Sequence, residues 1–191
     1  TMLASHQAFF ICPRSEISIA WANALNGTRA YIDSTPTTHT PTYQCSDDFI
    51  WHQDKPALTL ELGEAGFHQP AEEVSKMVIA NLLTTATRLI EQGIEHDRSQ
   101  TLAWLNTIPN QLIEHRTVHR EPYHSTAHAL RANIINFQPV ATGDVISEPG
   151  TPTMTIPADG FILFPKYPRR DESGQICEDL PKEIFRIIQP C

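Results

Sequence analysis

The most constraining feature of this 191-residue chain is a strand pattern that leads into a helix pattern. Residues 57–63 read Ala-Leu-Thr-Leu-Glu-Leu-Gly, and their alternation predicts a β-strand with one apolar face. After Pro70 the apolar residues recur at helical spacing as far as Ile90, and Gly93 predicts the end of the helix. A strand followed by a long amphipathic helix is typical of an α/β layer.

The residues before this pair predict the same kinds of element. Residues 7–12 form a short apolar run closed by a proline, which predicts a buried strand. Ser15 is a suitable N-cap for a helix that Gly27 would end, and residues 30–32 predict a second strand. Residues 33–48 are rich in Thr, Pro and Ser and predict a long loop, which either shapes a binding site or is a surface excursion.

The second half of the chain has a different composition, because prolines and glycines divide it into short segments. Apolar runs that predict strands lie at residues 134–137, 144–146, 153–156, 161–164 and 184–188. Short strands separated by turn residues favour a small β-barrel or β-sandwich. We therefore predict an α/β domain over residues 1–97 and a β-rich domain over residues 98–191.

Composition excludes several classes of protein. The net charge of −8 argues against nucleic acid as a partner, because an acidic surface repels phosphate groups. No apolar run is long enough to cross a membrane, and the first residues contain no signal-peptide pattern. The cysteines form no C-x-x-C pair, which predicts reduced thiols in a cytoplasmic protein; they are Cys12, Cys45, Cys177 and Cys191. Oligomeric state, including a homo-oligomer, is left open.

Glu61 is the first candidate for chemistry, because it is a carboxylate near the end of an otherwise apolar strand. A buried carboxylate without a partner is costly, so such a residue is usually paired or catalytic. The alternative is that Glu61 and Thr59 simply face solvent on an edge strand.

Four histidines form the second candidate: His115, His119, His124 and His128. On a helix, His115 and His119 would share a face and could bind zinc. On a strand they would lie about 13 Å apart, which is too far to share one ion. Nearby prolines disfavour a long helix, and no H-E-x-x-H motif is present. We therefore favour histidines at the surface or at a domain interface, with a histidine metal site as the alternative.

Four segments resemble motifs of one protein family and occur in its order. Residues 58–63 resemble a T-x-E-[LV]-G strand, and residues 5–13 resemble the strand that follows a D-L-H zinc motif. Residues 136–144 resemble an N-F-x-P-x-x-x-G segment, and residues 161–165 resemble a [VI]-L-F-P strand. These motifs are similar to those of the succinylglutamate desuccinylase/aspartoacylase family of zinc amidohydrolases, and the last two fit the desuccinylase branch better.

The resemblance implies both a fold and an activity. The fold would be the C-terminal part of a zinc-carboxypeptidase-like α/β layer, followed by a small β-rich domain. The activity would be zinc-dependent hydrolysis of small-molecule N-acyl amino acids such as N-succinylglutamate, in arginine catabolism. Glu61 would be the general base, and Arg169 or Arg170 would bind substrate carboxylates, unless these arginines form a solvated basic turn.

The resemblance also implies that part of the site is supplied from elsewhere. The family's zinc ligands come from H-x-x-E and D-L-H motifs, and neither motif occurs in this chain. Thr1 aligns directly after the D-L-H histidine. We therefore expect the zinc ligands upstream of Thr1, no metal ligand within this chain, and no hydrolysis by the chain alone. The alternative function is a metal-free binding or scaffold module that kept the fold and lost the chemistry.

Overall fold

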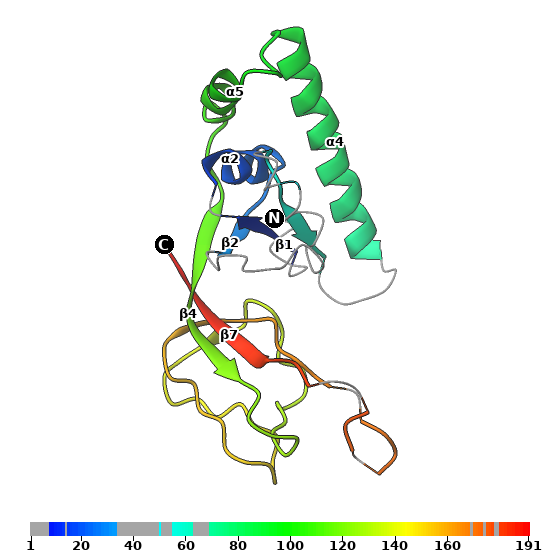
Figure 1. The fold of residues 1–191 in the computed structure, drawn as a ribbon, viewed down its shortest axis with the longest axis vertical. Coiled ribbons are helices and arrows are strands. Elements are labelled where there is room, and N and C mark those ends of the chain that lie inside the picture. Colours follow the sequence, from blue (N-terminus) through cyan, green and yellow to red (C-terminus); the bar gives the residue numbers. More distant parts are fainter. Residues whose placement is uncertain are drawn as a thin grey trace. The chain divides into compact units, whose positions relative to one another are not determined.

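The computed structural model describes residues 8–13, 15–33, 50, 55–62, 69–168, 170–173, 175–177 and 180–191. Its strands form a mixed seven-stranded sheet in the order β3-β1-β2-β4-β7-β6-β5. The described residues contain three helices (Figure 1). Contacts divide the chain into a first unit, which runs to His115 and includes Cys191, and a second unit, Arg116–Pro190. The predicted α/β fold class is confirmed at this level.

The first unit contains the predicted strands of the α/β layer. Strand β1 (Phe9–Pro13) pairs in parallel with β2 (Arg29–Asp33) and antiparallel with β3 (Thr59–Glu61). β2 also pairs in parallel with the beginning of β4 (Ile113–Pro122). The predicted loop over residues 33–48 lies almost entirely outside the described residues.

Two of the helices cover one face of these strands. Helix α2 (Glu16–Ala24) follows Ser15, whose extended backbone makes it the N-cap, and helix α4 (Gln69–Glu91) follows β3. Their shared core contains Ala8, Phe10, Cys12, Ala22, Leu25, Ala30, Ile32, Val74 and Val78. A Cβ atom at Gly27 would lie 2.9 Å from the Phe10 ring, so this close approach requires glycine.

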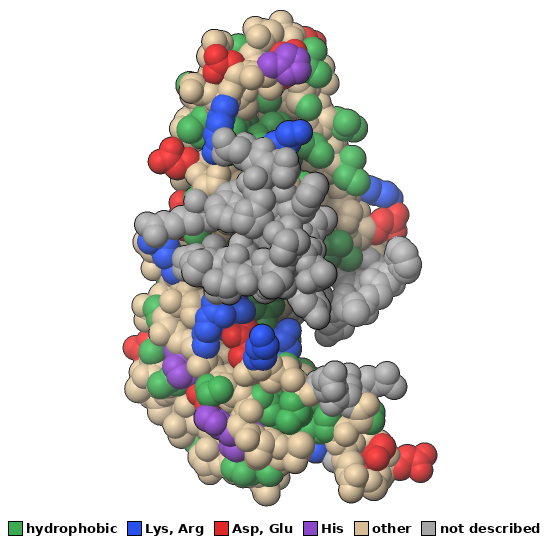
Figure 2. All heavy atoms as spheres, viewed as in Figure 1, with side chains coloured by type: hydrophobic (Ala, Val, Ile, Leu, Met, Phe, Trp, Pro, Cys, Tyr) green, Lys and Arg blue, Asp and Glu red, His purple; other side chains and the backbone are tan. Residues whose placement is uncertain are grey.

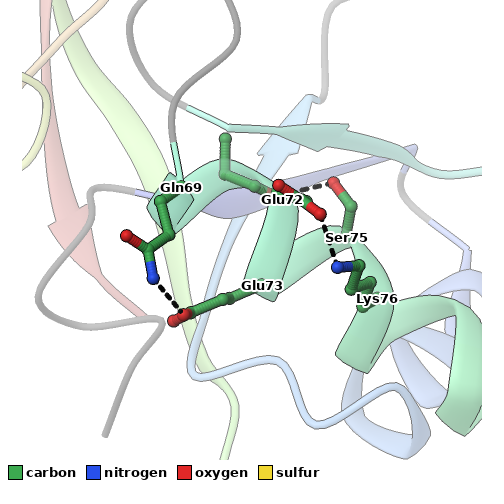
Figure 3. Close-up of polar contacts among 6 residues, drawn as sticks. Gln69, Glu72, Glu73, Ser75 and Lys76 are labelled. Atoms are coloured by element: carbon green, nitrogen blue, oxygen red, sulfur yellow. Dashed lines mark hydrogen bonds and ion pairs between the residues drawn. The ribbon is translucent and has the colours of Figure 1, made fainter.

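Helix α4 begins and ends with local interactions that its sequence provides. In the first turns, the Gln69 side chain donates to Glu73 at 3.1 Å, and Lys76 forms an ion pair with Glu72 (Figure 3). At the other end, Gly93 adopts a φ of 67° and donates its N–H to the Ile90 carbonyl at 2.9 Å. The helix therefore stops close to the predicted position.

The sequence did not predict helix α5 (Arg98–Leu105). Its N-cap is Asp97, whose side chain accepts the N–H of Gln100 at 3.0 Å. Leu105 is completely buried against Ile17 and Ala20 of α2, so α5 belongs to the first unit. The division by contacts follows His115, and the domain boundary predicted between residues 97 and 98 stays a prediction.

The second unit contains the rest of β4 together with β5 (Pro139–Val140), β6 (Gly160–Leu163) and β7 (Glu183–Pro190). Its core is aliphatic and aromatic and includes Leu130, Ile134, Ile146, Ile156, Ile162, Ile184, Phe185 and Ile187. The strands predicted over residues 161–164 and 184–188 are confirmed. A barrel or a sandwich for this unit stays a prediction.

The other three strand predictions in this unit are wrong. Residues 134–137 form a turn in which Phe137 has a φ of 61° and donates its N–H to the Ile162 carbonyl at 2.7 Å. Residues 144–146 and 153–156 make only one isolated bridge, between Val145 and Thr155. Ile134, Ile146 and Ile156 are buried all the same, whereas Ile135 and Val145 are exposed. Apolar content therefore indicated burial at only some of these positions and did not indicate strand pairing.

The described residues bear on the expectations about membrane-spanning helices and disulfides. None of the described helices is long and apolar enough to cross a membrane. Among the described cysteines, Cys12, Cys177 and Cys191, none forms a disulfide. Cys45 lies outside the described residues.

Candidate active site on the sheet of the first unit

Glu61 lies at the end of β3, on the face opposite the packed leucines. Leu58, Leu60 and Leu62 all pack against the core that α2 and α4 cover. Because side chains alternate along a strand, Thr59 and Glu61 lie on the other face. Both are partly buried, so Glu61 is neither in the core nor fully exposed to solvent.

The direction of β3 determines at which end of the strands Glu61 lies. β3 is antiparallel to β1, and Glu61 pairs with Phe9, the first residue of β1. Glu61 therefore lies at the end of the sheet where β1 begins. The carboxyl ends of β1 and β2 lie at the opposite end. The sequence placed Glu61 at the carboxyl end of its strand but could not show that this strand runs against its neighbours.

One cross-strand row places a cation on the same face as Glu61. Glu61 pairs with Phe9, and the register Phe10–Ala30 puts Phe9 opposite Arg29. Neighbouring strands lie about 4.8 Å apart, so the backbones at Glu61 and Arg29 are separated by about 10 Å. Arg29 is partly buried. Phe9, which lies between Glu61 and Arg29 in this row, is fully buried.

The next row along the same face contains Thr59, Ile11, Tyr31 and His115. His115 is only 3% exposed, and its Nδ1–H donates to the Ile113 carbonyl at 3.0 Å. Burial lowers the pKa of His115; hydrogen bonds to backbone carbonyls oppose this shift, and the positive charge of Arg29 adds to it. His115 is thus a buried imidazole that favours the neutral form, rather than a surface histidine.

These additional polar residues follow a pattern that sequence reasoning left unused. β2 reads Arg-Ala-Tyr-Ile-Asp, in which Arg29 and Tyr31 alternate with the buried Ala30 and Ile32. This is the same alternation that singled out Glu61. Strand register was still needed to bring Arg29 and His115 onto the face of Glu61.

The other histidines do not assemble a metal site. β4 is a strand, so His115 and His119 are separated by about 13 Å along it. Within the second unit, Glu121 accepts from His119 at 2.8 Å and pairs with His124 at 3.4 Å. No group of three or more His, Cys, Asp or Glu residues in the described part of the chain could hold a metal ion. The histidine metal site is therefore not formed, and the zinc that the resemblance implies does not fit the described residues.

Arg170, proposed from the sequence to bind substrate, lies in the second unit. Its Nη2 donates to the carbonyls of Thr126 at 3.0 Å and His128 at 3.5 Å, which ties its guanidinium to a neighbouring loop. It also lines a cavity of about 240 Å³ together with Lys166 and Glu148. Arg169 lies outside the described residues.

Fold and site together define a mixed α/β protein that carries a partly buried carboxylate at the end of β3, an edge strand of the described sheet. Its fold is similar to that of solved succinylglutamate desuccinylases. The Vibrio cholerae protein has a TM-score of 0.60 at 17% identity, and the Vibrio parahaemolyticus protein has a TM-score of 0.58 at 11% identity. Each comparison covers 97% of this chain and 49% of the other chain.

A third solved structure has the same fold. It is a succinylglutamate desuccinylase/aspartoacylase from Rhodobacter sphaeroides, with a TM-score of 0.56 at 12% identity over 96% of this chain and 53% of that one. No protein-family model matches the sequence, and no curated protein matches it. The structural neighbours thus share the fold, and this chain spans about half of their length.

Proposed function

We propose that this protein is an amidohydrolase of N-acyl acidic amino acids in which Glu61 is the general base. The observation that carries the proposal is the position of Glu61, which is partly buried at the end of β3 beside the first residue of β1. The fold shared with the desuccinylase structures supports the same reaction class. Such a reaction would belong to arginine catabolism, as the sequence resemblance implies.

Glu61 would act by moving one proton. The carboxylate would accept a proton from the water that attacks the amide carbonyl, and would then deliver it to the nitrogen of the leaving amine. The proton that the water loses is thereby returned to the product. This role requires a carboxylate on a rigid element beside an accessible space, and the paired strand β3 provides the rigid element.

Zinc belongs to the proposal, but the described residues do not hold it. When bound, zinc would supply Lewis-acid polarisation and a more acidic water. Its ligands would have to come from residues outside the described part of the chain, because that part contains no suitable group. The contribution assigned to the described residues is therefore limited to the base and to substrate binding.

Arg29 is the residue that we assign to a substrate carboxylate. It shares the face and the cross-strand row of Glu61, at a backbone separation of about 10 Å. A guanidinium binds a carboxylate through two parallel hydrogen bonds, which suits an acidic amino acid. Carboxylate binding by Arg169 or Arg170, which the sequence resemblance implies, stays a prediction.

The test is hydrolysis by the complete protein, measured as release of the free amino acid. N-succinylglutamate, N-acetylaspartate and N-acetylleucine would be compared in the wild type, in Glu61→Gln and in Glu72→Gln. Glu72 is an exposed carboxylate on α4, so Glu72→Gln is the matched control. We expect turnover of the acidic substrates only, lost in Glu61→Gln and retained in the control. Binding of these compounds without turnover by the wild type would favour the scaffold function.

A further inference from the structure

The first unit contains a cavity that the proposed reaction does not use. Its volume is about 590 Å³, within the range of about 300–1,000 Å³ that is usual for small-molecule sites. It lies among α2, α4 and α5, and its walls include Ile17, Trp21, Ala86, Leu89, Ile90 and Thr101. None of the residues in the rows of Glu61 and His115 lines this cavity.

The wall of the cavity is mostly apolar. Ile17 and Leu89 are each 3% exposed and form its floor. At the rim, Ile90 is 61% exposed and Ile50 is 40% exposed. Large aliphatic side chains exposed around a hollow are typical of a surface that binds an apolar group.

A second hollow continues the first and lengthens the apolar surface. Its volume is about 410 Å³, and it shares Trp21, Ile50 and Pro56 with the first. Leu82 and Leu25 extend it along α4 and α2. Together the two hollows could hold an extended hydrocarbon chain rather than only a compact ring.

The residues that line the cavity carry more positive than negative charge. Lys55 and Arg98 supply two cationic side chains, whereas Glu95 is the single carboxylate among the described lining residues, and it lies 3.6 Å from His96. Figure 2 shows Lys and Arg side chains beside hydrophobic surface in the part of the view where α4 and α5 lie. An anionic head group would thus be favoured at the rim, with an apolar body beneath it.

We propose that this cavity binds a medium-chain carboxylate, with its chain against Trp21 and Leu89 and its head group near Lys55 and Arg98. Neither hollow is lined by Glu61, Arg29 or His115, so the site can be tested on this chain whether or not the amidohydrolase proposal holds. The excess of positive charge on the lining favours a carboxylate over a neutral lipid or an alkylamine.

The probe is decanoate below its micellar concentration, with decanol and decylamine as comparison compounds. Binding would be measured by calorimetry and by tryptophan fluorescence, because Trp21 lines the cavity. We expect saturable 1:1 binding of decanoate, with decanol and decylamine at least fivefold weaker. Equal binding of the three compounds, or no saturable binding of decanoate, would overturn the proposal.

Two variants of α4 make a matched pair. Ile90 and Leu83 are similarly exposed, at 61% and 63%, but only Ile90 lines the cavity. We expect Ile90→Asp to lower decanoate affinity at least tenfold and Leu83→Asp to leave it unchanged, with both variants melting as the wild type does. An equal loss in both would show general adsorption to the helix and would refute the site.

The head group is tested by reversing charge. Lys55→Glu combined with Arg98→Glu should weaken decanoate at least fivefold and strengthen decylamine. Phosphatidylglycerol vesicles distinguish a free carboxylate from an anionic membrane surface. Co-sedimentation with the vesicles, combined with no binding of monomeric decanoate, would assign the cavity to a lipid surface and contradict the proposal.

Discussion

The two faces of the first unit's sheet use the same strands for different purposes. One face presents Phe10, Cys12 and Ala30, which are fully buried under α2 and α4. The other presents Glu61 and Arg29, both partly buried, beside the deeply buried Tyr31 and His115. Since side chains alternate along each strand, neighbouring residues can be committed to stability and to chemistry with little interference.

The largest expected effect separates the two faces on β3 itself. In the complete protein, Glu61→Gln should lower kcat by about 10²–10⁴-fold, the range for loss of a general base, with little change in stability. Leu60→Ala should do the opposite and lower the free energy of unfolding by about 2 kcal/mol, because Leu60 packs on the core. Steady-state kinetics and urea unfolding of both variants measure the contrast. Unchanged turnover in Glu61→Gln would exclude Glu61 as the base.

Arg29 should give the next largest effect if the polar face binds substrate. Arg29→Ala should raise KM for an acidic substrate by about 10–100-fold, which corresponds to losing about 1.5–3 kcal/mol from hydrogen bonds to a charged group. Arg29→Lys should recover only part of this, because lysine lacks the paired geometry. Arg88→Ala, at an exposed position of α4, is the control. A fall in kcat at constant KM would argue against carboxylate binding by Arg29.

The alternation of apolar and polar residues predicts the two faces of each single strand from the sequence. It does not predict how the strands lie beside one another. Leu58, Leu60 and Leu62 and the apolar residues of β1 identified the packed face, and Glu61 differed from them. That Arg29 and His115 lie on the face of Glu61 depends on strand order, direction and register. These are set by pairing between distant segments, which no local pattern records.

The elements that the sequence missed have equally physical reasons. Helix α5 buries only Thr101 and Leu105, so it lacks a clear apolar stripe, and its one signal is the cap formed by Asp97 and Gln100. In the second unit, the Asn136 side chain accepts the N–H of Phe164 at 2.7 Å, which stabilises a turn where apolar residues suggested a strand.

A smaller effect concerns the pH dependence of stability. The folded-state pKa of His115 lies below its usual 6.5 because the residue is buried. As the pH falls through 6.5, the unfolded chain therefore binds more protons than the folded chain. Acidification through this range thus lowers the free energy of unfolding. Well above pH 6.5, His115 contributes nothing to the dependence of that free energy on pH. The slope is at most about 1.4 kcal/mol per pH unit. Urea unfolding of the wild type and His115→Gln between about pH 5 and pH 8 measures it. Equal slopes in both would contradict this account of His115.

The smallest expected change concerns the reactivity of the Cys12 thiol, which checks whether the packed face is protected. Its side chain is fully buried, and burial together with the negative charge of Glu114 raises the pKa of its thiol to about 12. Because the thiolate is the reactive form, Cys12 should resist a thiol reagent at about pH 8 in the native state. A variant with Cys45, Cys177 and Cys191 replaced by serine isolates its reaction. We expect one thiol to be labelled in denaturant and almost none in the native protein, at a native rate limited by opening of the core. Rapid native labelling would mean that α2 and α4 do not protect this face, and the contrast between the two faces would fail.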